Sequence, residues 1–306
     1  MNYPLLFQAV YFEPLCVEVS VFHSVHAVLW PRIVNGKDMQ GVEAAAAPGG
    51  KSHKSAFTGR RATKAAPKIS YQGWTPVVTD ERFYYTLEGR EDVAVVPIYG
   101  ILAKNAGFME EACQGLSDIN GAMTAIQQAM KAKEIKTIVL DVASPGGQVT
   151  GIREIAAAVR EATQVRGKTV YTFSDERIAS AAYWIGSQAD EIYVTPSSTV
   201  GSIGTYLAWL DPSMKMAMEG LRLEYFGAGT HKGMGLPGKP LTEADRKLLQ
   251  GKVEEINGWF KDGVSAARPK VADSTMQGQT FSGEEAVKLK LADGLVGSWE
   301  EFIELL

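Results

Sequence analysis

The 306-residue sequence contains only two cysteines, Cys16 and Cys113, and these lie far apart. Their spacing matches neither a metal-binding motif nor a redox motif, and two cysteines cannot build the disulfide framework of a small secreted domain. We therefore expect two reduced thiols, as is usual for a protein of the cytoplasm. No motif for a cofactor or a metal ion is found, and none is expected to be needed.

An excess of positive charge is also missing. Lysine and arginine number 31 against 35 aspartates and glutamates, so the formal net charge is −4. A nucleic-acid-binding protein usually carries a basic surplus, so no nucleic-acid partner is expected. The hydrophobic fraction of 45% and the charged fraction of 22% are those of an ordinary globular protein that folds around a core.

The sequence has no uninterrupted apolar run long enough to cross a membrane. Residues 4–33 are apolar on the whole, but Glu13, Pro14 and Glu18 interrupt them. A membrane-spanning helix needs about 20 consecutive apolar residues. The same stretch lacks the positive start and the small-residue end of a secretory signal peptide. We expect a soluble protein without a membrane span, located in the cytoplasm.

Composition divides the chain into three parts. Residues 1–35 are predicted to form an accessory segment, a helix or a pair of strands that packs on the body or on another subunit. Residues 36–70 are rich in alanine, glycine and lysine and poor in large apolar residues. Such a stretch buries too little surface to offset its ordering entropy, which predicts a flexible linker. Residues 71–306 are predicted to form the main domain.

Within the main domain, short apolar runs alternate with helical patterns. Apolar residues recur at helical spacing over 117–132, and further helices are predicted at about 150–165, from near 180, at 242–267 and at about 283–290. Strands are predicted at 92–99, 137–142, 169–174, 191–195 and 221–226. Alternation of this kind indicates βαβ units and a largely parallel sheet, which is the α/β class.

Three segments at strand ends carry candidate chemistry, because functional sites of parallel α/β folds gather there. The first is Ser144-Pro145-Gly146-Gly147, which follows the strand at 137–142. Paired glycines let backbone N–H groups face a ligand without an intervening side chain. Such a turn can supply part of an oxyanion hole, and it can equally be an ordinary tight turn.

The second segment places Ser180 among small residues where a helix begins, in the order Ala179-Ser180-Ala181-Ala182. At such a position a serine can serve as a nucleophile, with the N–H of Ala181 donating to a developing oxyanion. The structural alternative is that Ser180 simply caps the helix.

The third segment is a glycine-rich loop that contains His231 and Lys232, after the predicted strand at 221–226. A lysine that acts as a base near neutral pH must be partly desolvated. The neighbouring histidine is a rival base, and the spacing alone does not decide between the two residues.

Taken together, these motifs resemble the serine peptidase family of signal peptide peptidase A and the phage capsid proteases. The resemblance covers roughly residues 90–300. It rests on an apolar strand followed by SPGG, then ASAAY, VGSIG, a strand followed by GTHKG, and finally FSGEEA and LADGLV, in this order. It implies a spiral of ββα units like that of the caseinolytic protease (ClpP) and crotonase superfamily, with an N-terminal extension and a flexible linker added.

The resemblance also implies roles for individual residues. Ser180 takes the position of the nucleophile, Lys232 that of the general base, and Ser202 that of the serine that orients the lysine, while His231 becomes a bystander. Gly147, or less favourably Gly146, and Ala181 match the donors of the oxyanion hole. Ala143 departs from the family pattern, which usually has a polar residue before the SPGG turn.

The resemblance implies a serine endopeptidase with a Ser–Lys dyad that acts on protein or peptide substrates. The N-terminal block around FQAVYFEPL resembles the start of phage head proteases, which favours a capsid assembly protease acting on scaffold or capsid proteins in the host cytoplasm or the assembling head. The alternative is a soluble enzyme that degrades membrane-derived or signal peptides. The family forms homo-oligomers whose sites draw residues from neighbouring subunits, although for single-domain members the resemblance implies Ser180 and Lys232 in one chain.

Two further interpretations compete with the peptidase. A catalytically silent scaffolding subunit would not need Ser180, Lys232 and Ser202 together. An acyl-CoA enzyme on the same fold would need a coenzyme A-binding environment, and no such motif is found.

Overall fold

The computed structural model of the chain describes residues 14–18, 76–77, 82–87, 89–105 and 116–306. The predicted linker at 36–70 and most of the predicted accessory segment at 1–35 lie outside the described residues. Cys16 is a free thiol, whereas Cys113 lies outside the described part of the chain.

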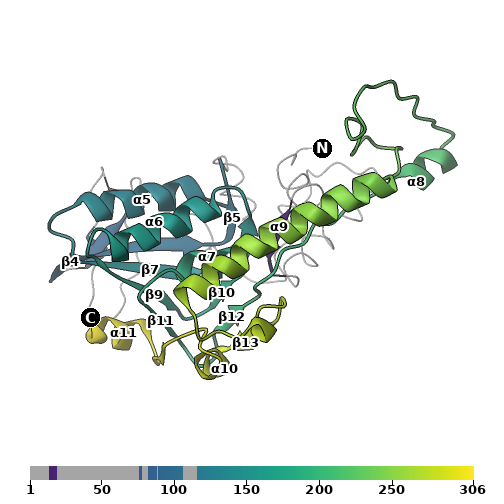
Figure 1. Cartoon of the computed structure of the whole chain (residues 1–306). Coiled ribbons are helices and arrows are strands. Elements are labelled where there is room, and N and C mark those ends of the chain that lie inside the picture. The colour runs from purple at the N-terminus through teal and green to yellow at the C-terminus, as the bar shows by residue number, and fades with distance from the viewer. Residues whose placement is uncertain (1–13, 19–75, 78–81, 88, 106–115) are drawn as a thin grey trace, which may run out of the picture.

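A seven-stranded sheet forms the centre of the body, in the order β14-β11-β9-β7-β4-β3-β2 (Figure 1). Its strands are β2 (Pro76–Val77), β3 (Tyr85–Leu87), β4 (Arg90–Tyr99), β7 (Thr137–Ala143), β9 (Thr169–Ser174), β11 (Glu191–Val194) and β14 (Gly294–Leu295). The strands from β4 to β14 pair in parallel, while β2 and β3 form an antiparallel edge. The predicted α/β class is confirmed by this arrangement.

Two smaller sheets are built from short strands that follow the central ones. They have the orders β1-β8-β5-β6 and β10-β12-β13. The strands are β1 (Leu15–Val17), β5 (Ile101–Ala103), β6 (Leu116–Asp118), β8 (Gly146–Gln148), β10 (Arg177–Ala179), β12 (Thr199–Gly201) and β13 (Thr280–Ser282). A long strand, a short strand and a helix thus recur along the chain, as in β7, β8 and α6, which agrees with the expected ββα units.

Helices cover both faces of the central sheet (Figure 1). The helices are α5 (Ile119–Lys131), α6 (Ile152–Gln164), α7 (Ala181–Gly186), α8 (Ser213–Met218), α9 (Glu243–Ala267), α10 (Gly283–Lys288) and α11 (Trp299–Leu305). Helices α5, α6 and α7 bury their apolar faces in one large core with the sheet. On the other face, Phe302 of α11 stacks on Phe173 of β9 with ring centroids 5.0 Å apart.

The predicted long helix is confirmed as α9, with its cap. The Thr242 hydroxyl accepts a hydrogen bond from the N–H of Asp245, whose carboxylate in turn accepts from the Thr242 N–H, which is a capping box. Near its C-terminal end, Phe260 stacks on Trp184 of α7 with ring centroids 4.9 Å apart and an angle of 8° between the rings. Helix α9 is therefore fixed to the short helix that follows Ser180.

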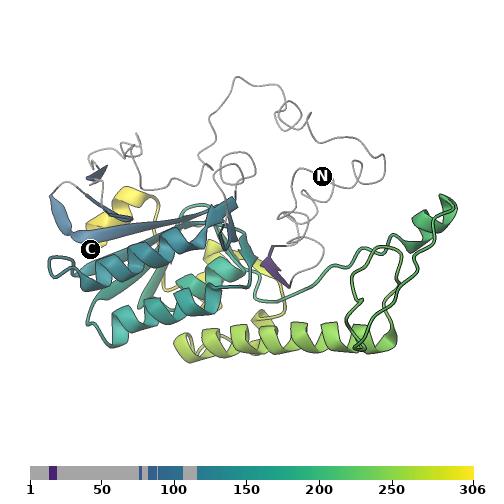
Figure 2. The same ribbon diagram turned by 90° about the horizontal axis from the view of Figure 1, so that it is seen from above.

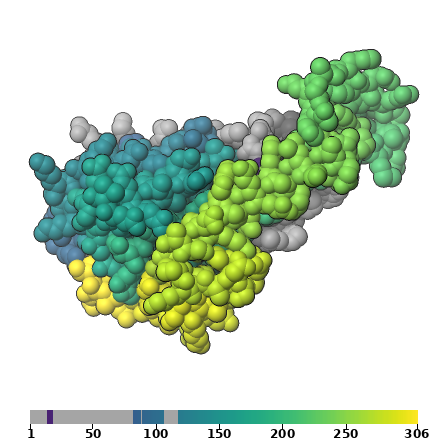
Figure 3. All heavy atoms as spheres, in the orientation of Figure 1, coloured from purple at the N-terminus to yellow at the C-terminus, as the bar shows by residue number. Residues whose placement is uncertain are grey.

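Residues 207–240, here called the arm, leave the body between β12 and α9 (Figures 1 and 2). In the space-filling view the arm forms a separate green lobe (Figure 3). The predicted strand at 221–226 is wrong for this structure, because these residues lie in the arm without a strand partner and are almost all exposed. Their alternating apolar and charged residues fit a strand, but a strand needs a neighbour to satisfy its backbone.

Asp141 is a buried carboxyl group inside β7. It accepts a hydrogen bond from the Tyr99 hydroxyl of the neighbouring strand β4. Burial raises the pKa of Asp141 to about 7, and the hydrogen bond from Tyr99 only partly opposes this. The ordinary pKa of an aspartate in an unfolded chain is about 3.9.

This pKa difference predicts how stability depends on pH. Between about pH 4 and pH 7 the folded chain holds a proton on Asp141 that the unfolded chain has lost, so the free energy of unfolding falls as the pH rises. Asp141→Asn keeps an oxygen acceptor for Tyr99 and removes the titration. We expect urea unfolding to give a free-energy difference, variant minus wild type, that rises by on the order of a few kcal/mol across this interval. A difference that stays flat with pH would contradict the buried protonated state.

Candidate active site

Ser180 lies at the junction of β10 and α7, and its backbone is in a conformation that L-residues rarely adopt. Its φ is 54° and its ψ is −123°. The Ser180 N–H donates to the Gly201 carbonyl at 2.7 Å, and the Ser180 carbonyl accepts from the N–H of Trp184 at 2.9 Å. Strained non-glycine residues persist where the surrounding structure over-determines them, and they cluster at functional sites.

The side chain of Ser180 is buried and unused by the fold. Ser180 is 1% exposed, its hydroxyl has no hydrogen-bond partner, and it makes no capping bond to α7. The structural alternative, a serine that caps the helix, is therefore excluded for this structure. Buried polar atoms are nearly always paired, so an unpaired hydroxyl on a strained backbone points to a functional role.

Gly146 brings the SPGG segment directly against Ser180. A Cβ added at Gly146 would lie 2.8 Å from Cβ of Ser180 and 2.9 Å from the amide nitrogen of Ala181. The φ of Gly146 is +95°, so its backbone conformation also requires glycine. The structure thus brings together Ser180, Ala181 and the Gly146-Gly147 pair, as the sequence predicts.

The two glycines have different neighbours. The Gly146 N–H donates to the hydroxyl of Ser144 at 3.1 Å, and Ser144 itself is fully buried and donates to the Gly100 carbonyl. Gly147 pairs in register with Leu102 of β5, and an added Cβ would lie 2.0 Å from the Leu102 carbonyl oxygen. The Ser144 hydroxyl therefore holds the turn in place and already accepts the hydrogen bond of the Gly146 N–H.

Ser202 follows β12 just as Ser180 follows β10. The two strands pair in parallel with Ala179 opposite Gly201, so the two serines occupy matching positions beyond the strand ends. Ser202 is 5% exposed, has a φ of 53°, and its N–H donates to the Gln279 carbonyl at 2.6 Å. Ser202 therefore lies on the neighbouring strand end, held by β13 and its preceding loop.

Lys232 is not brought to Ser180 within the chain. It lies in the arm, it is exposed, and no hydrogen bond joins it to Ser180 or Ser202. For single-domain members the resemblance implies both residues in one chain. In this structure Ser180 follows β10 in the body, whereas Lys232 belongs to the arm (Figures 1 and 2).

His231, the rival base, is tied to α9. Its Nδ1 lies 2.6 Å from Oδ1 of Asp245, the residue that also closes the capping box. Hydrogen bonds from Thr242 and His231 lower the pKa of Asp245 to about 2, so this carboxylate is charged at neutral pH. His231 is thereby anchored at the base of the arm, which fits a structural role next to Lys232.

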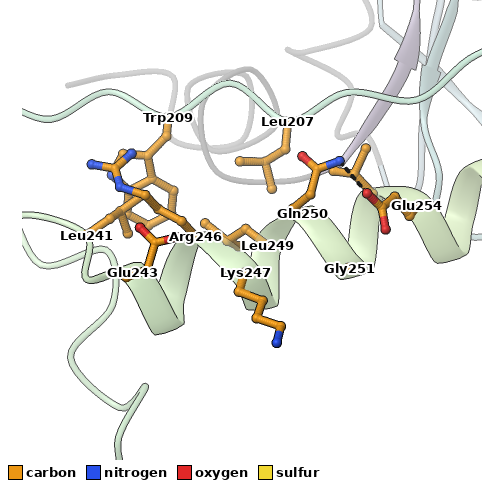
Figure 4. A pocket seen from close by; sticks show the side chains of 11 residues that line it. Leu207, Trp209, Leu241, Glu243, Arg246, Lys247, Leu249, Gln250, Gly251 and Glu254 are labelled. Atoms are coloured by element: carbon orange, nitrogen blue, oxygen red, sulfur yellow. Dashed lines mark hydrogen bonds between the residues drawn. The ribbon is translucent and has the colours of Figure 1, made fainter.

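A shallow groove of about 630 Å³ lies between the first residues of the arm and α9 (Figure 4). Leu207, Trp209 and Leu249 supply an apolar wall, and Glu243, Arg246 and Glu254 are among the polar residues around it. None of the residues predicted for the site lines this groove. Among the described residues there is no cluster of three metal-ligating side chains, and no helix long and apolar enough to span a membrane.

The comparisons with known proteins agree with the geometry around Ser180. Residues 162–305 match the profile of Peptidase family S49. This part of the chain is therefore similar to the peptidases of family S49. The resemblance to signal peptide peptidases and phage capsid proteases that the motifs indicate is thereby confirmed.

Similar relatives come from phage and from bacteria. The chain is 27% identical over 219 residues to capsid assembly protease C of Escherichia phage lambda, a match that covers 71% of this chain and 48% of that protein. It is 27% identical over 238 residues to protease 4 of Salmonella typhi, covering 75% of this chain and 37% of the relative. The matches therefore span less than half the length of these two relatives. A solved structure of a ClpP1 variant from Listeria monocytogenes aligns with a TM-score of 0.41 and 12% identity over 68% of this chain and 93% of that one.

Because the backbone at Ser180 is strained, replacing Ser180 by glycine should stabilise the fold while it removes the hydroxyl. In Ser180→Gly the positive φ becomes unstrained, and we expect the free energy of unfolding to rise by about 1 kcal/mol in spite of the extra freedom of glycine in the unfolded chain. Ser187→Gly is the matched control, because Ser187 is also fully buried in this segment but has a φ of −63° and donates to the Trp184 carbonyl. Ser187→Gly is expected to destabilise the fold. Equal losses in both variants, measured by denaturant unfolding, would argue against strain at Ser180.

Proposed function

We propose that this protein is a serine endopeptidase of the S49 type in which Ser180 is the nucleophile and Lys232 the general base. The observation that carries the proposal is the Ser180 hydroxyl, which is buried, unpaired and held on a strained backbone beside a glycine turn. Serine needs an adjacent base to attack a carbonyl, and Ser–Lys pairs are an accepted form of this arrangement. The relatives named proteases support the same reaction class.

In the proposed reaction an uncharged Lys232 amine accepts the proton of the Ser180 hydroxyl while its oxygen attacks the peptide carbonyl. The oxyanion accepts hydrogen bonds from the N–H of Ala181 and from the glycine turn. The Gly146 N–H already donates to Ser144, and we propose the Gly147 N–H as the donor on the turn. The lysine ammonium then protonates the leaving amine, and water hydrolyses the acyl-enzyme on Ser180. Ser202 lies beside Ser180 and is proposed to orient the lysine.

We propose that the lysine reaches Ser180 from a neighbouring copy of the chain. Lys232 is exposed in the single chain, whereas a catalytic lysine needs a partly desolvated position. The arm that carries it also exposes large apolar side chains, with Phe226 90% and Met218 86% exposed. Exposed apolar residues gathered on one projecting segment are typical of an interaction surface. A homo-oligomer in which arms pack on neighbouring bodies would bury both the arm and Lys232.

The proposed biological role is capsid assembly, with cleavage of scaffold or capsid proteins. The match to capsid assembly protease C of phage lambda over 71% of this chain supports this role. The second candidate is a peptidase that degrades signal or membrane-derived peptides, which the resemblance to protease 4 and to signal peptide peptidases favours. Mass spectrometry of cleavage products after incubation with scaffold and capsid proteins, and in parallel with signal peptides, distinguishes the two roles.

Single substitutions test the dyad. Ser180→Ala and Lys232→Ala should each lower kcat for peptide cleavage by about a thousandfold or more, because the members of such a pair act as a unit. His231→Ala is the matched control from the adjacent position and should keep most of the activity, with some loss of stability through the contact to Asp245. Activity that survives in Lys232→Ala and disappears in His231→Ala would overturn the choice of base.

Mixing the two inactive variants tests whether the dyad forms between copies. In a randomly mixed oligomer of Ser180→Ala and Lys232→Ala chains, a Ser180 and a Lys232 from different copies meet at about one quarter of the sites, given cyclic head-to-tail contacts. We therefore expect co-expressed variants to recover about a quarter of wild-type activity. A mixture that stays as inactive as either variant, in an oligomer shown to contain both chains, would place the whole dyad in one copy.

A further inference from the structure

The short strand β1, from the N-terminal part of the chain, lies against the site. On one side it pairs antiparallel with β8, with Cys16 opposite Gly147 and Val17 opposite Gly146. On its other side, the Leu15 N–H donates to the Tyr206 carbonyl at 2.8 Å and the Tyr206 N–H donates to the Leu15 carbonyl at 3.0 Å. An extended peptide segment is thus held between two backbone edges, one of which is the glycine turn.

The backbone of β1 reaches the nucleophile. The Cβ that Gly146 lacks would lie 2.2 Å from the carbonyl oxygen of Cys16, 2.8 Å from Cβ of Ser180 and 2.9 Å from the amide nitrogen of Ala181. These three atoms therefore surround one small volume. The Cys16 carbonyl and the Ser180–Ala181 backbone thus pack against the same side of Gly146, the side on which a side chain would project.

The side chains of β1 are buried against the body, as the side chains of a bound peptide would be. Leu15, Cys16 and Val17 are 4%, 1% and 7% exposed. The Cys16 thiol lies 3.2 Å from the hydroxyl of Thr205, which follows the VGSIG segment directly. An extended peptide that adds a strand to a sheet edge takes affinity from main-chain bonds and specificity from alternating side-chain pockets.

The end of β1 is fastened by two further contacts. The Glu18 N–H donates to the Pro145 carbonyl at 2.9 Å, and the Glu18 carboxylate forms an ion pair of 3.1 Å with Arg177 of β10. Pro145 belongs to the turn and Arg177 lies three residues before Ser180. Both contacts therefore draw the segment onto the elements that position the nucleophile.

We propose that the cleft between β8 and Thr205-Tyr206 is the binding site for an extended substrate peptide, and that Leu15–Val17 of the same chain fill it as an internal competitor. This inference rests on the proposed peptidase function. It assigns the subsite beside Thr205 to a small substrate side chain, because Cys16 fills it with almost no exposed surface. Protein substrates enter only when β1 leaves, so the chain holds its own site closed until the segment is displaced.

The Cys16 thiol reports directly on this displacement. Burial raises the pKa of Cys16 to about 12, so the docked thiol is inert toward alkylation. In a Cys113→Ser, Ser180→Ala chain, Cys16 is the sole thiol and no cleavage interferes. We expect iodoacetamide labelling of Cys16 to accelerate at least about tenfold, and saturably, on addition of a synthetic peptide of residues 12–19 with Ser at position 16, because the peptide traps the open cleft. A scrambled peptide of the same composition is the control.

The opposite outcome of the labelling experiment is equally clear. If β1 is a permanent part of the fold, the peptide leaves the labelling rate unchanged, and Cys16 reacts only at denaturant concentrations that unfold the whole chain. That result overturns the proposal, and it needs no catalytic activity to be observed.

A second pair of variants measures the effect on cleavage in the full-length chain. Cys16→Trp cannot fit beside Thr205 and should expel β1, which raises kcat/KM for an added peptide by about fivefold or more. Cys16→Ser keeps the size of the side chain and should behave like the wild type. Lower activity in a folded Cys16→Trp chain would refute the inference.

The two proposals fail in distinguishable ways. Absence of any Ser180-dependent cleavage in all chains would refute the peptidase function, while the labelling rates still decide whether a peptide displaces β1. If cleavage depends on Ser180 but the peptide does not change the labelling rate of Cys16, the peptidase function stands and the proposal that β1 is an internal competitor is refuted.

Discussion

Where β8 passes Ser180, the packing has no room for one additional carbon atom. The missing side chain of Gly146 lets the turn, the nucleophile and the first residue of α7 approach within contact distance. Its positive φ aims the turn at this point, and the buried hydroxyl of Ser144 holds it there. The strained backbone of Ser180 completes the arrangement, because the adjacent end of β12 fixes its N–H. The chemistry proposed for the site follows from this close approach of backbone segments.

The sequence predicts the body of the molecule well, because its signals there are local. The buried run of β7 and the capping residues of α9 each indicate their element without knowledge of the rest of the chain. The SPGG turn and the small residues around Ser180, by themselves, also fit an ordinary turn and a helix cap, and only the resemblance to the peptidase family assigns a nucleophile to Ser180. The strain at Ser180, by contrast, arises from contacts with the end of β12, which no local pattern reveals.

The errors and omissions lie where structure depends on distant partners. The alternating residues at 221–226 predict a strand, yet a single chain gives them no neighbour to pair with. Lys232 matches its motif, but its position relative to Ser180 depends on how the arm packs. Leu15–Val17 form a strand of only three residues, and this strand exists only because it pairs with the distant glycine turn of β8. Periodicity over such short stretches carries too little information to predict any of these arrangements.

Helix α9 connects the body next to Ser180 with the base of the arm that carries Lys232. Phe260 stacks on the helix that follows the nucleophile, while Asp245 holds the histidine beside the lysine. Fifteen residues of α-helix separate these two anchors, which corresponds to an axial length of roughly 22 Å. The length of this helix therefore sets how far the base of the arm lies from the part of the body that holds Ser180. Changing its number of turns would shift the arm relative to the body and leave the body itself intact.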